Sequence, residues 1–253
     1  MQLNAQSRTL IGSVMLLAAT QAHATLTSYT SNGVDVVYSS VSDVTWTKDA
    51  NLLGSMIASQ GFSTVVNNIL AVSPAISNTP NYFSPTGTYT LTISDFSSNG
   101  RVSWFGAMAF INYLNSNNYA GSNQWRLPTV VNTAFGYNTA TNGTAAGDEL
   151  VELFSSELGG KEWSNIPDTA TFDNEQASVY WSGAEYARDS RYAYNFDTSI
   201  GHQYDDDKSY LFYAWAVSPG QISAVPAPPA AWLFGSGLLG VAGFARRKIK
   251  PCN

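Results

Sequence analysis

The chain has 253 residues, with 18 acidic and 12 basic side chains and a formal net charge of −6. All 18 acidic residues but only seven of the basic ones lie between residues 25 and 223, so this part carries about −11, which argues against binding to nucleic acid or anionic lipid. The single cysteine, Cys252, and the two histidines, His23 and His202, exclude thiol chemistry, internal disulfides and a multi-histidine metal site from the body of the chain.

The first 24 residues have the organisation of a secretory signal peptide. The cation Arg8 precedes an apolar stretch over residues 10–19, and Ala22-His23-Ala24 fits the small-x-small pattern that signal peptidase cuts. We expect cleavage after Ala24 and export of the remainder. A buried N-terminal helix is the less favoured alternative.

Residues 29–53 predict two short strands joined by a turn at Asn32-Gly33. The interval from residue 50 to 94 then contains no charged residue and three prolines. We expect it to be an uncharged insertion, mostly loop, with one short helix over residues 63–70.

Two amphipathic helices are predicted next, over residues 104–116 and 147–158. Their apolar stripes consist of Trp104, Met108, Ile111 and Leu114 in the first, and of Leu150, Leu153, Phe154 and Leu158 in the second.

Three aromatic-rich stretches, residues 178–186, 191–201 and 211–220, predict strands of an antiparallel sheet. Polar segments separate them, and residues 204–208 are expected to form a turn. Helices followed by such a sheet indicate one α+β domain over residues 25–222.

The C-terminal segment combines prolines, an apolar stretch and a basic cluster. Val225, Pro226 and Pro228 precede an apolar run over residues 230–245, which Arg246, Arg247, Lys248 and Lys250 follow. This run is near the length of a membrane span, and the basic cluster predicts that the tail lies inside and the body outside.

The segment over residues 225–250 resembles a PEP-CTERM sorting signal, although Ala227 stands where the type motif has glutamate. The resemblance implies processing by an exosortase, transient anchoring in the inner membrane by the tail, and a final place at the cell surface or outside the cell. Exosortase and signal peptidase are therefore the expected processing partners.

The body resembles the Lcl C-terminal domain family of secreted bacterial proteins, a domain of unknown function. The residues that carry the resemblance include Trp125, Arg126, Leu127 and Pro128, followed by Trp181 and Trp215. It implies a C-type-lectin-like fold, similar also to formylglycine-generating enzymes, and the binding of sulfated polysaccharides or adhesion to surfaces that some members show. The cysteines of the formylglycine-generating activity are absent from the body, so that activity is not expected.

Most of these residues are expected to be structural. Trp125 and Trp181 are interpreted as core aromatics, and Arg126 is expected to pair with a carboxylate, either Glu149 or Glu185.

A run of three carboxylates, Asp205, Asp206 and Asp207, is the candidate metal site, with calcium as the ion. The spacing of a helix–loop–helix calcium loop is absent, so a solvated hairpin turn is the favoured alternative.

Surface aromatic residues beside cations are the candidate ligand-binding set. They are Tyr186, Arg188, Arg191, Tyr192 and Tyr204, whose rings and polar groups suit a glycan. Tyr180, Trp181 and Trp215 are expected in the core instead.

These features favour a non-enzymatic surface or matrix protein that binds exopolysaccharide or a surface glycan. There is no Gly-x-Ser-x-Gly motif, and His202 is the only histidine base in the body. A glycan-active hydrolase with paired carboxylates and a purely structural matrix protein are the alternatives.

Overall fold

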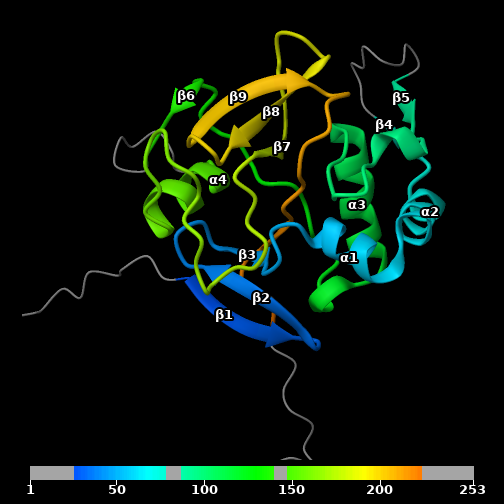
Figure 1. The fold of residues 1–253 in the computed structure, drawn as a ribbon, viewed down its shortest axis with the longest axis horizontal. Coiled ribbons are helices and arrows are strands. Elements are labelled where there is room, and N and C mark those ends of the chain that lie inside the picture. Colours follow the sequence, from blue (N-terminus) through cyan, green and yellow to red (C-terminus); the bar gives the residue numbers. More distant parts are fainter. Residues whose placement is uncertain (1–25, 78–86, 140–146, 224–253) are drawn as a thin grey trace, which may run out of the picture.

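A computed structural model describes residues 26–77, 87–139 and 147–223. The predicted signal peptide and the predicted sorting signal lie outside these residues. Within the described ranges, no helix has both the length and the apolar character needed to span a membrane. The fold is mixed α/β, and every pair of named strands is antiparallel (Figure 1).

The first sheet contains the strands β1 (Leu26–Ser31), β2 (Val34–Ser39), β3 (Val44–Thr47) and β10 (Val217–Pro219), in that spatial order. Asn32 and Gly33 connect β1 to β2 with φ angles of 49° and 77°, which confirms the predicted hairpin turn. Because β10 pairs with β3, the two ends of the described chain meet in this sheet.

The interval predicted as an uncharged loop is largely ordered secondary structure. It contains α1 (Leu52–Gln60), α2 (Phe62–Val72) and the small β4–β5 hairpin (Ala75–Ser77 with Thr88–Thr90). The predicted short helix is confirmed as part of α2, but the loop prediction is wrong for α1. Asn51 caps α1 by accepting a hydrogen bond from the backbone N–H of Gly54.

Both of these helices are stabilised by apolar packing rather than by charge. Leu53, Ile57, Val65 and Ile69 are buried in one core cluster with the next helix, α3 (Trp104–Ser116). The uncharged insertion therefore packs against α3, and the sequence of the insertion alone does not show this partner.

The two predicted amphipathic helices are confirmed. Trp104, Ile111 and Leu114 of α3 are buried, while Met108 is only partly buried. The second helix begins as α4 (Glu149–Glu152) and continues as a π-helical turn over Leu153–Glu157.

The second sheet has the order β6 (Gly136–Tyr137), β9 (His202–Asp207), β8 (Tyr192–Asp197) and β7 (Val179–Glu185). Figure 1 shows this sheet opposite the first one, with α1–α3 at one side and α4 at the other. The predicted turn over residues 204–208 is wrong, because residues 204–207 belong to β9 and pair with β8.

The prediction of a strand over residues 211–220 is wrong for most of the segment, although its side chains do alternate between two sides. Residues 211–220 do not join the second sheet as one strand, since only Val217–Pro219 is a strand and it belongs to the first sheet. Instead, isolated bridges link Phe212 to Val102 and Tyr213 to Tyr180.

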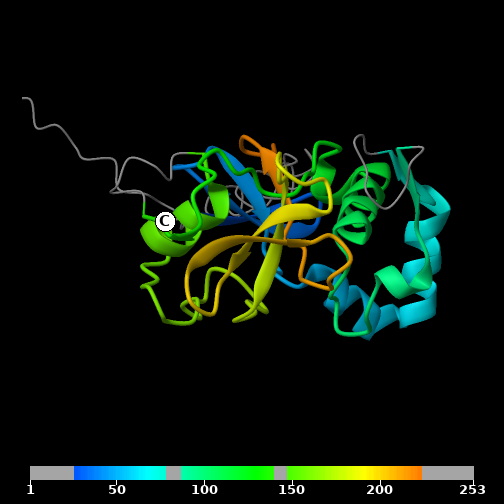
Figure 2. The same ribbon diagram turned by 90° about the horizontal axis from the view of Figure 1, so that it is seen from above.

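This extended segment separates two hydrophobic cores. Ala214 and Ala216 contact the core that contains α1, α2 and α3, whereas Tyr213, Trp215 and Val217 contact the core beside α4. Figure 2 shows the corresponding division, with the three helices at one end of the molecule. The alternation of small and aromatic residues thus serves two cores rather than a core and solvent.

Candidate functional site

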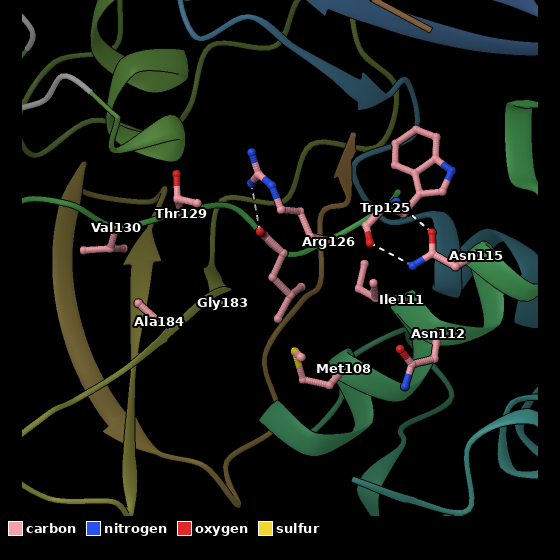
Figure 3. Close-up of a pocket in the computed structure, with 11 residues that line it drawn as sticks. Met108, Ile111, Asn112, Asn115, Trp125, Arg126, Thr129, Val130, Gly183 and Ala184 are labelled. Carbon is pink, nitrogen blue, oxygen red and sulfur yellow. Dashed lines mark hydrogen bonds between the residues drawn. The ribbon is translucent and has the colours of Figure 1, made fainter. Parts of the chain in front are cut away.

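The segment Trp125–Thr129 forms one wall of a cavity of about 360 Å³ (Figure 3). Helix α3 provides the opposite wall, and Gly183 and Ala184 of β7 lie beside it. The lining consists of Met108, Ile111, Asn112, Asn115, Trp125, Arg126, Leu127, Thr129, Val130, Gly183 and Ala184.

Trp125 is fixed at the edge of this cavity by hydrogen bonds on both its backbone and its ring. Asn115 donates from Nδ2 to the Trp125 carbonyl at 2.9 Å and accepts from the Trp125 N–H at 2.7 Å. The indole Nε1 donates to the carbonyl of Tyr119. With only 2 % of its surface exposed, Trp125 is a structural residue, as predicted.

Arg126 pairs with Glu149, one of the two partners expected for it. Nη1 lies 2.7 Å from Oε2 and Nη2 lies 2.6 Å from Oε1, so the contact is bidentate. Glu149 also accepts from the backbone N–H of Thr129 at 2.9 Å. The other candidate, Glu185, pairs with Lys208 instead.

The neighbouring carboxylate Asp148 holds the following part of the loop. It accepts hydrogen bonds from the backbone N–H groups of Val131 and Asn132. Burial raises the pKa of Asp148, and these two N–H groups act in the opposite direction. The start of α4 therefore fixes the loop over residues 126–132 through two adjacent carboxylates.

The polar groups around the cavity are engaged in the fold. The guanidinium of Arg126 points away from the cavity toward Glu149, and Asn112 donates to Ser73. Met108, Ile111 and Leu127 contribute the apolar surface that remains. The cavity thus suits an apolar group, and it offers few polar partners for the hydroxyls of a sugar.

The other family tryptophans also belong to the core. Trp181 and Trp215 are fully buried, and their indole N–H groups donate to the carbonyls of Val102 and Thr47. Tyr180 is buried as well, so all three residues predicted for the core are confirmed there.

The predicted ligand-binding residues separate into two places. Tyr186, Arg188, Arg191 and Tyr192 lie in or beside the β7–β8 connection, where Arg191 pairs with Asp189 at 2.6 Å. Tyr204 lies on β9 opposite Asn195, three residues along β8 from Tyr192.

The three acidic side chains do not all lie on one face of β9. They occupy successive positions on β9, so Asp206 points to the opposite side of the strand from Asp205 and Asp207. Asp206 accepts from Asn195, and Asp207 accepts from Ser209. In the part of the chain that the structure describes, no three His, Cys, Asp or Glu side chains form a group that could hold a metal ion.

The residues around His202 form a surface cluster that the sequence interpretation did not single out. The Trp163 ring lies 4.5 Å from the His202 ring, and His202 Nδ1 lies 2.8 Å from the Tyr204 hydroxyl. His202 Nε2 lies 3.1 Å from Oε1 of Glu162. We refer to Glu162, Trp163, His202 and Tyr204 as the Trp163 cluster.

One sequence signal could have indicated Trp163. It is an isolated aromatic residue in the polar stretch Gly-Lys-Glu-Trp-Ser-Asn, and such a residue has few local apolar partners. Its neighbour in the cluster, His202, is 39 residues away in the chain, so their contact depends on the tertiary fold.

Paired carboxylates, the basis of the hydrolase alternative, occur beside α4. Glu152 accepts from Ser42, and Glu157 accepts from Ser39 through both oxygens. Burial raises the pKa of Glu157 to about 7, and the neighbouring charge of Glu152 acts in the same direction. Neither residue lines the cavity beside α3, so the pair has a structural explanation in the contact between α4 and the β2–β3 turn.

Comparison with known proteins gives one family. The model of the Lcl C-terminal domain matches residues 35–218. No curated protein and no solved structure matches the chain.

Proposed function

The chain belongs to the Lcl C-terminal domain family, and on that premise we propose that it is an exported, non-enzymatic protein that binds exopolysaccharide or a cell-surface glycan. A C-type-lectin-like relationship of the fold is part of the same proposal. The principal support is the distribution of exposed aromatic side chains.

All four exposed aromatic side chains of the described residues lie on or beside the second sheet. Phe135 precedes β6, Tyr204 is on β9, Tyr210 follows β9, and the Trp163 ring contacts the His202 ring of β9. Their exposed fractions range from 36 % for Tyr204 to 69 % for Trp163. Exposed aromatic rings with polar neighbours bind the C–H face of a sugar while hydrogen bonds orient its hydroxyls.

The charges of the second sheet favour a ligand that is not a polyanion. A sulfated ligand would need a basic patch, for which Arg188, Arg191 and Lys208 are the available cations. Lys208 is fully buried and pairs with Glu185, and Arg191 pairs with Asp189. The net charge of about −11 on residues 25–223 also disfavours a polyanionic ligand.

Export rests on the two ends of the chain. The signal-like segment over residues 1–24 and the PEP-CTERM-like segment over residues 225–250 are the basis for proposing a cell-surface or extracellular location. In this proposal, signal peptidase and an exosortase process the chain, and the tail is its transient membrane anchor.

A glycan array probed with the full chain in a mild detergent, with calcium and with chelator, tests the binding proposal. We expect binding to neutral glycans that chelator leaves unchanged, because the carboxylates on β9 do not converge. If the chain binds no glycan but is retained in the extracellular matrix, the structural alternative replaces the proposal. Release of reducing ends from a bound glycan would replace it with the hydrolase alternative.

A further inference from the structure

We infer that the Trp163 cluster is a subsite for one uncharged pyranose ring of a β-linked glycan. The inference rests on the proposed function and assigns it a site and a ligand class. It excludes the cavity beside α3, whose polar groups are already used by the fold.

The first observation is the backbone of Trp163. Its φ angle is 61°, in the left-handed region that bulky side chains rarely adopt. The N–H of Trp163 donates to the carbonyl of Ile200 at 2.9 Å, and Ser164 bridges both the N–H and the carbonyl of Lys161. These bonds hold an unfavourable conformation, and such strain is common at ligand-binding positions.

The second observation is the exposure of the indole. The Trp163 side chain is exposed over 69 % of its surface although it contacts His202. The strained conformation therefore does not serve to bury the ring. It instead presents a large aromatic surface to solvent beside β9, which suits stacking against an apolar face of a ligand.

The third observation is the support beneath the ring. The His202 side chain is only 7 % exposed and has a partner at each nitrogen, Glu162 and the Tyr204 hydroxyl. In the neutral imidazole, Nε2 donates to the carboxylate and Nδ1 accepts from the hydroxyl. His202 is thus a positioning residue that contacts the Trp163 ring while its two nitrogens bind Glu162 and the Tyr204 hydroxyl.

Two polar groups remain for a ligand. The Glu162 side chain is 44 % exposed, and its Oε2 has no partner among the described residues. In the tautomer with the proton on Nε2, the Tyr204 hydroxyl donates to His202 Nδ1, and its oxygen retains lone pairs that can accept a further hydrogen bond. Both groups accept hydrogen bonds, so they suit the hydroxyls of a sugar.

The ligand class follows from shape and charge. A pyranose with equatorial hydroxyls has its axial C–H groups on a flat face, which an indole can cover, and β-linkages keep this face available along a chain. Glu162 contacts His202 Nε2 and Asp197 is the cross-strand partner of His202, whereas Lys161 is the one cation next to either carboxylate in the chain. An uncharged ring is therefore favoured over a sulfated or carboxylated one.

Titration calorimetry of the full chain in a mild detergent tests the site. The probes are cellohexaose and chitohexaose, with maltohexaose for linkage and heparin for charge. We expect Trp163→Asn to weaken binding of a β-linked probe roughly ten- to hundred-fold. Asparagine tolerates the left-handed backbone, so the melting temperature should stay within about 4 °C.

Ile93→Asn is the matched control, because Ile93 is also an exposed apolar residue, at 55 %, but lies in the 3-10 turn Ile93–Asp95, outside the second sheet. It should leave the affinity unchanged. If Trp163→Asn binds as tightly as the unaltered chain, the site is wrong while the proposed function stands. Preference for heparin would overturn the ligand class, and absence of binding to every probe and to the array would overturn both.

Discussion

Arg126 and Glu149 form a bidentate ion pair that joins the Trp-Arg-Leu-Pro-Thr segment to the first turn of α4. The glutamate side chain is only 5 % exposed and also accepts the N–H of Thr129. The pair fixes the loop that passes between the two sheets, because Arg126 also exchanges both backbone hydrogen bonds with Val217 of β10.

Arg126→Ala should destabilise the fold by about 2–4 kcal/mol, since it leaves the Glu149 carboxylate buried without its counter-charge. Chemical denaturation measures this loss. Lys48→Ala is the control, because its partner Asp173 is 55 % exposed and such surface pairs contribute little. Equal losses in the two variants would show that Arg126 is no more important than a surface cation.

Glu157 should make stability depend on pH. Its pKa is raised from 4.5 to about 7, so the folded state retains a proton that the unfolded state loses. The contribution of this proton to the free energy of unfolding is fully present below about pH 4.5 and is lost as the pH rises through about 7. After allowance for partial solvent screening it amounts to about 1–2 kcal/mol.

Melting temperatures at about pH 5 and about pH 8 check this prediction. Glu157→Gln should flatten the decline toward high pH, whereas Asp43→Asn, at an exposed position, should leave it unchanged. Burial also raises the pKa of Asp148 and Glu175, so part of the decline should persist in Glu157→Gln. An identical pH profile for Glu157→Gln and the unaltered chain would refute the assignment.

Gly201 is the glycine at which a methyl group should be most harmful to the second sheet. It has a φ of +77°, and an added Cβ would lie 2.5 Å from the buried ring of Phe154. We expect Gly201→Ala to cost about 2–4 kcal/mol, from backbone strain and from displacement of a core ring. Urea denaturation of this variant measures the cost.

Gly220→Ala is the matched comparison for Gly201. Its φ is +64°, but no heavy atom lies within 4 Å of the added Cβ, so only the strain of about 1 kcal/mol should appear. A loss at Gly201 no larger than that at Gly220 would mean that the Phe154 ring moves aside freely.

The basic cluster of the C-terminal segment should govern sorting. Replacing Arg246, Arg247 and Lys248 with glutamine should alter surface display, because basic residues keep the tail on the cytoplasmic side of the membrane. Labelling of intact cells measures the display. Neutralising Arg188 and Arg191 instead should leave display unchanged. Normal display of the first variant would count against the sorting proposal.

The sequence by itself determined the features that depend on neighbouring residues. The Asn32-Gly33 turn, α3, the helix that begins at Glu149, and the burial of Trp125 were all predictable. Each depends on a residue that tolerates a special backbone angle, on a helical stripe, or on the size of an aromatic side chain. For Arg126 the sequence indicated a carboxylate partner such as Glu149 or Glu185, and the structure shows Glu149.

Only the tertiary structure decided which distant segments meet. Residues 204–207 look like a polar turn, but pairing with β8 makes them a strand. The segment around Trp215 has a strand's alternation, but bridges to Val102 and Tyr180 place it between two cores. Trp163 belongs to the proposed sugar subsite only because the fold brings its ring into contact with His202. The paired residues lie from nine positions apart, for Asn195 and Tyr204, to 110 apart, for Val102 and Phe212. Local periodicity cannot specify which of these partners a segment takes.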